Sequence, residues 1–279
     1  MCDIGVTPYG PVPGAARSRI FSVKINGKTV FVEKYKDICC TRFAFRGKAY
    51  ITVTAPEEIE RCVISPKSRG INATCSGNRA EFAVDKPVKL IIQINGLEKL
   101  FLFADPYEEN PPELGQPKVV SIMDFSTDNT GTAVETARLQ QAINYVSGLD
   151  GGRGGVLYFP AGIYRTGSLH MRSNVTLYLE SGALIQGTDN PADYTSGAAG
   201  KRTALICISD ACNAAIKGRG MIDGNGKVLR GRGLNSRLLL IRNSRNILIE
   251  DVTLRDSGSW NTHIIDSDYI NLTNIKLIN

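Results

Sequence analysis

Hydrophobic and polar positions alternate with a period of two along the first 107 residues. Short turn sequences interrupt the alternating runs at Asn26-Gly27, Arg46-Gly47, Ser76-Gly77-Asn78 and Asn95-Gly96. An Asn-Gly pair between two alternating runs is a strong short-range indication of a β-hairpin. No helical period separates the runs, so the pattern predicts an antiparallel β-sandwich over residues 1–108. The following segment, ENPPELGQP over residues 109–117, predicts a stiff linker because of its prolines.

The pattern changes from residue 118 onward, where a helix and then a repeat are predicted. Thr132 and Glu135 have the spacing of a capping box, which predicts that a helix follows them. The residues that fall on one face of this helix are apolar: Leu139, Ala142, Ile143 and Val146. The helix therefore has a face that can be buried against other elements.

Four later segments share a kernel of fixed spacing. An apolar residue is followed five positions later by Asn or Tyr, and three positions further on by Leu or Ile. The kernels start at Leu169, Ile208, Ile241 and Ile264, and their fifth-position residues are Asn174, Asn213, Asn246 and Tyr269. A constant kernel with insertions of variable length is typical of a solenoid. An ordinary β-sandwich with coincidental alternation is the alternative, and four aligned kernels disfavour it.

The repeat unit contains strands and no helix, so it predicts a right-handed parallel β-helix over residues 118–279. The helix predicted near residues 136–147 would cap its N-terminal end as a short α-helix. Each coil of a solenoid needs a neighbour on both sides to bury its core. A coil ending at Asn279 would expose apolar side chains and a strand edge, so we expect the β-helix to continue beyond Asn279.

The charge and apolar content of the chain limit the kinds of partner that are expected. The net charge of +6 over 279 residues is mild and forms no long basic run, so no nucleic-acid partner is expected. A mildly basic surface suits an anionic substrate, although a solvated positive face is the simpler explanation. No stretch approaches the roughly 20 apolar residues of a membrane span. The N-terminus has no apolar signal segment, which predicts a cytoplasmic protein, or a secreted one if Met1 is not the true start.

The seven cysteines form no recognisable metal or disulfide framework. Their number is odd, no C-x-x-C pair occurs, and the chain has only two histidines. Free thiols are the simpler interpretation, and no metal or other cofactor is expected.

Several stretches resemble the opening of the polygalacturonase-type glycoside hydrolases of family 28. One begins VVSIMDFSTDNTGTAVETARLQQ at Val119, a second is GRGMIDGNG over residues 218–226, and a third is LRDSGSWNTHIIDSDYINLTNIKLIN. The first domain more loosely resembles the β-sandwich that precedes the β-helix in dextranase-like enzymes and in some members of family 28. The resemblance implies that the full-length protein hydrolyses α-galacturonides, or related pectic bonds, with inversion.

The catalytic motifs of the family are not found in this sequence. The resemblance implies an Asn-Thr-Asp-Gly segment, an Asp-Asp pair, a Gly-His-Gly segment and an Arg-x-Lys segment, all on coils beyond Asn279. No catalytic residue is therefore assigned, and the 279 residues alone are predicted to be inactive. A pectate-lyase-like enzyme with a Ca²⁺ site and a non-catalytic, tailspike-like binding protein remain as alternatives.

Five residues are the candidates for contact with a pectic oligosaccharide: His263, Trp260, Arg230, Arg232 and Asp223. Trp260 and His263 precede the missing catalytic coils, and an aromatic ring and a hydrogen-bonding ring suit a sugar. Arg230 and Arg232 are chosen from six clustered arginines because insertions build binding faces and a guanidinium matches a carboxylate. Asp223 lies between glycines, where an Asx-turn that satisfies its own backbone is the alternative.

Overall fold

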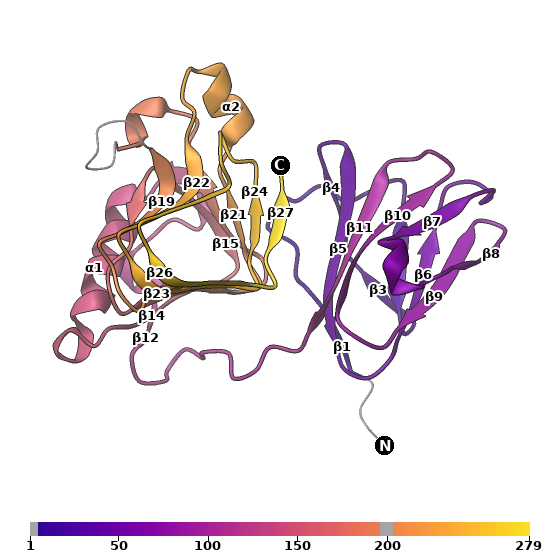
Figure 1. Ribbon diagram of the computed structural model, residues 1–279, viewed down its shortest axis with the longest axis horizontal. Coiled ribbons are helices and arrows are strands. Elements are labelled where there is room, and N and C mark those ends of the chain that lie inside the picture. Colours follow the sequence, from indigo (N-terminus) through magenta and orange to yellow (C-terminus); the bar gives the residue numbers. More distant parts are fainter. Residues whose placement is uncertain (1–4, 196–202) are drawn as a thin grey trace. The chain divides into compact units, whose positions relative to one another are not determined.

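The computed structural model describes residues 5–195 and 203–279 and divides the chain into two compact units. The first unit comprises residues 1–109 and the second residues 110–279. Figure 1 shows the ribbon of each unit. Among the described residues, no helix has both the length and the apolar composition needed to cross a membrane.

In its described part, the first unit consists of two sheets that enclose one core. Sheet 1 has the order β1-β5-β11-β10-β7, with β4 paired to β5; its strands are β1 (Val6–Pro8), β4 (Val32–Tyr35), β5 (Ile38–Phe45), β7 (Cys62–Ser65), β10 (Val88–Ile94) and β11 (Lys99–Pro106). Sheet 2 has the order β3-β2-β6-β9-β8, with β2 (Ser22–Ile25), β3 (Lys28–Val30), β6 (Ala49–Thr54), β8 (Thr74–Ser76) and β9 (Arg79–Val84). Alternate residues of both sheets are buried in a shared cluster, which makes the unit a β-sandwich.

The turns at Asn26-Gly27 and Asn95-Gly96 join hairpins, as the sequence predicts. β2 pairs with β3, and β10 pairs with β11, both antiparallel. Asn26, Gly27, Asn95 and Gly96 all have positive φ angles. Asn26 and Gly27 form a two-residue loop, which requires this conformation, whereas Asn95 and Gly96 begin the longer connection of residues 95–98. The segment around Ser76-Gly77-Asn78 likewise joins β8 to β9.

Two details of the predicted sandwich are wrong. The Arg46-Gly47 turn does not close a hairpin, because β5 lies in sheet 1 and β6 in sheet 2. The sandwich is also not wholly antiparallel, since β5 and β11 pair in parallel from Ile38↔Lys99 to Phe45↔Pro106. After β5 the chain crosses from sheet 1 to sheet 2, so the strand that follows β5 does not pair with it. β11 takes that place later, after its hairpin with β10, and runs in the same direction as β5.

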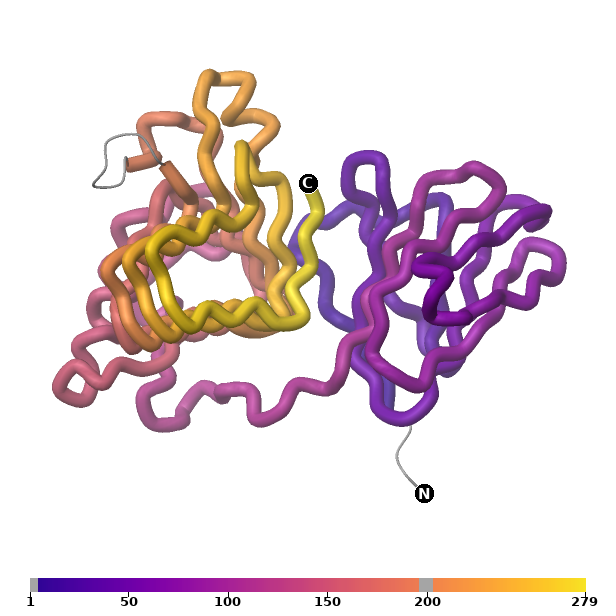
Figure 2. The backbone as a smooth tube through the Cα atoms, in the orientation of Figure 1, coloured from indigo at the N-terminus to yellow at the C-terminus, as the bar shows by residue number. Residues whose placement is uncertain are grey.

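The second unit, in its described part, is built from three parallel sheets, here called walls 1 to 3, through which the chain passes in turn. Wall 1 contains β12 (Val119–Ser121), β14 (Gly155–Phe159), β17 (Val175–Leu179), β20 (Ala215–Gly218), β23 (Arg245–Glu250) and β26 (Asp268–Thr273). Wall 2 contains β13 (Thr130–Val134), β15 (Gly162–Thr166), β18 (Ala183–Gly187), β21 (Met221–Asp223), β24 (Thr253–Arg255) and β27 (Lys276–Ile278). Wall 3 contains β16 (Leu169–His170), β19 (Ala204–Ser209), β22 (Arg237–Arg242) and β25 (Thr262–Ile265). Figure 2 shows the coils stacked on one another, so the unit is a parallel β-helix.

The repeated asparagines of the kernel form one corner of the β-helix. Asn174, Asn213 and Asn246 all have φ angles in the left-handed region. Asn213 Nδ2 donates to Asn174 Oδ1 at 3.1 Å, and Asn246 Nδ2 donates to Asn213 Oδ1 at 2.7 Å. In the next coil Tyr269 takes this position, and the Arg245 guanidinium lies 4.8 Å from the centre of its ring. The periodicity in the sequence thus reflects a turn that each coil repeats.

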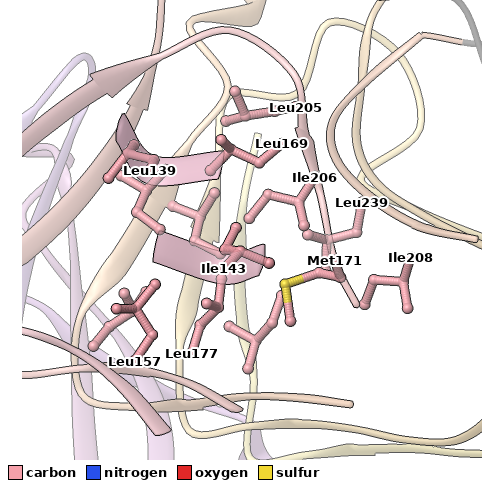
Figure 3. Close-up of a cluster of buried hydrophobic side chains, with 14 of the residues drawn as sticks. Leu139, Ile143, Leu157, Leu169, Met171, Leu177, Leu205, Ile206, Ile208 and Leu239 are labelled. Carbon is pink, nitrogen blue, oxygen red and sulfur yellow. The ribbon is translucent and has the colours of Figure 1, made fainter. Parts of the chain in front are cut away.

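Helix α1 (Thr136–Gly152) packs its apolar face against the first coils. Leu139, Ala142, Ile143 and Val146 are fully buried, as the helical period predicts. Figure 3 shows Leu139 and Ile143 among core residues that include Leu157 and Leu177 of wall 1 and Leu169 of wall 3. The shorter helical elements are α2 (Gly226–Gly231) and the 3₁₀ turns η1 (Lys67–Arg69), η2 (Ile122–Phe125) and η3 (Pro191–Asp193).

The capping box predicted for this helix is wrong. Thr132 lies in β13, where its backbone N–H donates to the Asp128 carboxylate at 3.0 Å. Glu135 is the N-cap but makes no side-chain cap, since its carboxylate accepts hydrogen bonds from Arg138 at 2.8 and 2.9 Å. Asp128 therefore keeps this segment extended, and the helix begins later than the capping box predicts.

Candidate functional site

The outward face of wall 3 carries the candidate site. In-register pairing aligns His170, Cys207, Leu240 and His263 across its four strands. Cys207 and Leu240 belong to a small cluster apart from the β-helix interior, whereas their neighbours Ile206 and Leu239 belong to the interior. Because side chains in register share a face of a sheet, His263 lies on the outward face, and Leu240 is its neighbour on the preceding coil.

Trp260 and His263 of the last described coil form a contiguous group with Arg237 of the coil before it, here called the Trp260 cluster. The Trp260 and His263 rings are 4.2 Å apart between centroids and inclined by 48°. Arg237 Nε, at the start of β22, donates to His263 Nδ1 at 2.7 Å. Trp260 is 60% exposed, so it presents a large aromatic surface to solvent beside two hydrogen-bonding groups.

The hydrogen bond from Arg237 decides which nitrogen of His263 carries a proton. A guanidinium has only donors, so the Nδ1 atom that receives its hydrogen must be an acceptor. A neutral imidazole with an acceptor at Nδ1 carries its proton at Nε2. The hydrogen bond from Arg237 therefore assigns His263 as a neutral ring with its proton at Nε2.

The two arginines predicted as substrate contacts, Arg230 and Arg232, form hydrogen bonds with the chain segments that precede strands of wall 3. Arg230, on α2, donates from Nη1 to the carbonyl oxygens of Ser257 and Gly258 at 2.8 and 3.1 Å. Arg232 donates to the Asp189 carbonyl oxygen at 2.8 Å and forms an ion pair with its carboxylate at 2.9 Å. Arg165 binds the same carboxylate. The pKa of Asp189 is lowered, first by a hydrogen bond from its own backbone N–H and then by the charges of Arg232 and Arg165. Neither arginine belongs to the Trp260 cluster.

Asp223 lies inside the second unit. It is 5% exposed, and its carboxylate accepts hydrogen bonds from Arg255 Nε at 2.6 Å and from the Asn225 backbone N–H at 2.9 Å. Burial raises the pKa of Asp223, while the charge of Arg255 and both hydrogen bonds act in the opposite direction. This geometry is that of the Asx-turn alternative, extended by a buried ion pair with the next coil.

Sequence reasoning noted Arg237 only as one of six clustered arginines. Its partner, His263, lies 26 positions further along the chain, and only the register between β22 and β25 brings them together.

Among the described residues, no group of three or more His, Cys, Asp or Glu side chains is placed to hold a metal ion. A hollow of about 380 Å³ in the first unit is lined by residues that include Glu60, Arg61 and Asn95, but the Asn95 amide is already used by backbone groups of residues 58, 60 and 61.

The sequence relatives found by comparison with known proteins carry the names polygalacturonase or exo-poly-alpha-D-galacturonosidase. The chain is 34% identical over 125 residues to an exo-poly-alpha-D-galacturonosidase of Dickeya chrysanthemi, covering 39% of this chain and 20% of that protein. It is 29% identical over 178 residues to a Vitis vinifera protein named "Probable polygalacturonase", covering 57% of this chain and 36% of that protein. The chain is polygalacturonase-like. It spans about a third or less of the length of these relatives, and no family model matches it.

The fold of this polygalacturonase-like chain also has a counterpart among solved structures. Dex49A from Penicillium minioluteum is similar with a TM-score of 0.60, covering 97% of this chain and 60% of that chain at 13% identity. At this identity the similarity concerns the fold alone. An exopolygalacturonase from Thermotoga maritima is similar over 61% of this chain and 48% of that chain, with a TM-score of 0.50 and 21% identity.

Proposed function

We propose that this polygalacturonase-like chain is part of a glycosidase that hydrolyses α-galacturonide or related pectic bonds with inversion. The sequence relatives support the class of enzyme, since their names specify galacturonide hydrolysis. The observation that carries the proposal for this chain is the Trp260 cluster on the outward face of wall 3. It joins an exposed aromatic ring to an arginine and a histidine, which suits a ring-shaped substrate that bears carboxylates.

Each member of the cluster has a separate role in this proposal. The indole of Trp260 stacks on the apolar face of a sugar ring, as aromatic rings with one exposed face do in binding sites. The Nε2–H of His263 donates to a hydroxyl or carboxylate oxygen of the substrate. Arg237 fixes the orientation of that donor, and its positive charge favours an anionic sugar over a neutral one.

Inverting hydrolysis further requires a general acid and a general base about 6.5–9.5 Å apart, with a water molecule between them. The outward positions that wall 3 aligns with His263 are occupied by His170, Cys207 and Leu240, and none of these is a carboxylate. Adjacent coils are about 4.8 Å apart, so carboxylates on neighbouring coils would span the required gap. We propose that residues outside these 279 supply both groups, and that the 279 residues alone bind but do not hydrolyse.

Binding is tested by the fluorescence of Trp260, which is the single tryptophan of the chain. A titration with oligogalacturonate is expected to change its emission saturably, and neutral galacto-oligosaccharides of the same length are expected to have little effect. His263→Ala is expected to weaken the response at least tenfold, whereas His170→Ala, at the other end of the same row, is expected to leave it unchanged. Equal responses to charged and neutral sugars would contradict the uronate assignment.

Hydrolysis is tested with a polypeptide that continues past Asn279 in the coding sequence. An Asn-Thr-Asp-Gly-like segment, followed about one coil later by an Asp-Asp pair, would supply the acid and base. The longer polypeptide is then expected to release reducing ends from oligogalacturonate, and replacement of either aspartate to abolish the release. An unsaturated uronate among the products would instead identify a lyase.

A further inference from the structure

The first unit has an edge at which its two sheets are joined by a short connection. β7 is the last strand in the order of sheet 1, and β8 is the last strand in the order of sheet 2. The chain passes from one to the other through residues 66–73, which include the 3₁₀ turn η1. Both strands are short, and β8 is exposed along its whole length. Each carries one cysteine, Cys62 on β7 and Cys75 on β8.

Register shows that both cysteines face the space between the sheets. Cys62 pairs with Ile94 and Cys75 pairs with Ala80. Ile94 and Ala80 are completely buried in the core of the sandwich. Since paired residues of neighbouring strands point to the same face of a sheet, Cys62 and Cys75 point toward each other's sheet. Cys62 is partly buried against the core, and Cys75 is exposed at the open edge.

The side chain of Cys75 belongs to the surroundings of the Cys62 thiol. Burial raises the pKa of Cys62 to about 11, and the influence of Cys75 adds to the rise. The register therefore brings the two cysteines to one edge of the sandwich, with both side chains turned toward the space between its sheets.

We propose that Cys62 and Cys75 form a disulfide bond that cross-links the two sheets of the sandwich when a small-molecule disulfide such as oxidised glutathione is supplied. The bond is expected to stabilise this edge. It joins two residues that are 13 positions apart and so restricts the conformations of the unfolded chain. It would also fix β8, whose pairing with β9 extends over only three residues. The other cysteines of the chain take no part.

The bond forms by two exchange steps that balance. The exposed Cys75 thiolate first attacks oxidised glutathione, which forms a mixed disulfide and releases one glutathione thiolate. The Cys62 thiolate then attacks the Cys75 sulfur, forms the Cys62–Cys75 bond and expels the second glutathione thiolate. The two cysteines give up two electrons and two protons, and the glutathione disulfide becomes two molecules of the thiol.

Peptide mapping of the full chain tests the proposal directly. Cleavage after Lys and Arg places Cys62 in the peptide of residues 62–67 and Cys75 in the peptide of residues 70–79, each with a single cysteine. After treatment with oxidised glutathione and alkylation of the remaining thiols, the two peptides are expected as one linked species. Its mass is expected to equal the sum of the two peptides less two hydrogen atoms.

Two variants and a local measurement separate this bond from other oxidation products. Cys75→Ser is expected to abolish the linked peptide, whereas Cys212→Ser, which removes another exposed cysteine, is expected to retain it. Hydrogen exchange of residues 62–76 is expected to slow at least tenfold on oxidation of the unaltered chain, with no change in Cys75→Ser. A Cys75 that stops at the glutathione adduct while Cys62 remains alkylatable, or a link between two chains, would overturn the proposal.

Discussion

Arg237 and His263 illustrate how one hydrogen bond sets the chemistry of a surface residue. Arg237 donates to His263 Nδ1 at 2.7 Å, and this places the proton of the ring at Nε2, the atom proposed to donate to a substrate oxygen. Trp260 packs on the same ring. At this scale the site depends on the orientation of a ring rather than on the number of charges around it.

Arg237→Ala is therefore expected to weaken oligogalacturonate binding about tenfold, because the His263 ring loses the partner that orients it. Imidazole ¹⁵N spectra of His263 are expected to show a mixture of the two neutral tautomers in place of one. Arg153→Ala removes the same charge from a position with an 82% exposed side chain and serves as the matched control. An unchanged tautomer in Arg237→Ala would contradict the positioning role.

Asp128 is a partly exposed residue, and the pKa of its carboxylate is lowered to about 2 by hydrogen bonds from the backbone N–H of Ala133, from Thr130 and from the Thr132 backbone. Because its pKa in the folded state is depressed, these bonds stabilise the loop above the ordinary pKa of 3.8 and are lost as the pH falls through about 2. A ¹³C titration of this carboxyl group is expected to have its midpoint near pH 2. A midpoint near 3.8 would contradict the hydrogen bonding.

The buried pair of Asp223 and Arg255 and the exposed pair of Asp189 and Arg232 allow a matched comparison. Asp223→Asn leaves Arg255 buried without this counter-charge, which is expected to cost about 3 kcal/mol in the free energy of unfolding. Asp189→Asn affects a pair in which the Arg232 side chain is 50% exposed, and its cost is expected to stay below about 1 kcal/mol. Urea unfolding followed by Trp260 fluorescence reports on the second unit and measures both. Similar costs for the two variants would contradict the assignment of Asp223 to a buried pair.

At the scale of elements, the β-helix is held in register by its repeated corner as well as by its strands. Asn213 both adopts a positive φ angle and forms side-chain hydrogen bonds to the coils on either side. Asparagine tolerates the left-handed conformation better than other residues with a Cβ atom, apart from aspartate. The corner therefore joins a conformational requirement to an intercoil contact in one residue type.

Two substitutions at Asn213 separate these contributions. Asn213→Gly keeps the left-handed conformation and loses the hydrogen bonds, with an expected cost of about 1 kcal/mol. Asn213→Ala loses the bonds and also strains the backbone, with an expected cost of about 2 kcal/mol. Urea unfolding of the second unit measures both costs. If alanine and glycine were equally destabilising, the conformational part of the argument would be wrong.

At the scale of the whole molecule, the chain consists of two units with separate cores. The segment between them, ENPPELGQP, is mostly exposed. A protease specific for glutamate is expected to cut first at Glu109 or Glu113 and to leave two resistant pieces, which mass spectrometry would identify. Initial cleavage outside residues 109–117, at Glu60 or Glu180 for example, would contradict the predicted linker.

The sequence by itself determined the elements whose causes are local. Asn26-Gly27 and Asn95-Gly96 predict their hairpins because both pairs favour the positive φ angles that a tight reversal of the chain requires. The spacing of Asn174, Asn213 and Asn246 predicts the β-helix because each coil repeats the same corner. The apolar face of α1 follows from the helical period, whereas its start does not, because Asp128 holds the preceding strand from outside the helix.

Only the tertiary structure decided the contacts that join segments distant in the chain. The parallel pairing of β5 with β11, the bond between Arg237 and His263, and the pair of Cys62 and Cys75 all depend on which strands become neighbours and in what register. No local pattern marks these residues, since each one also suits an ordinary strand position. The burial of whole strands sets the register, and the register places these side chains. Their positions therefore depend on the folded core and not on the residues next to them in the sequence.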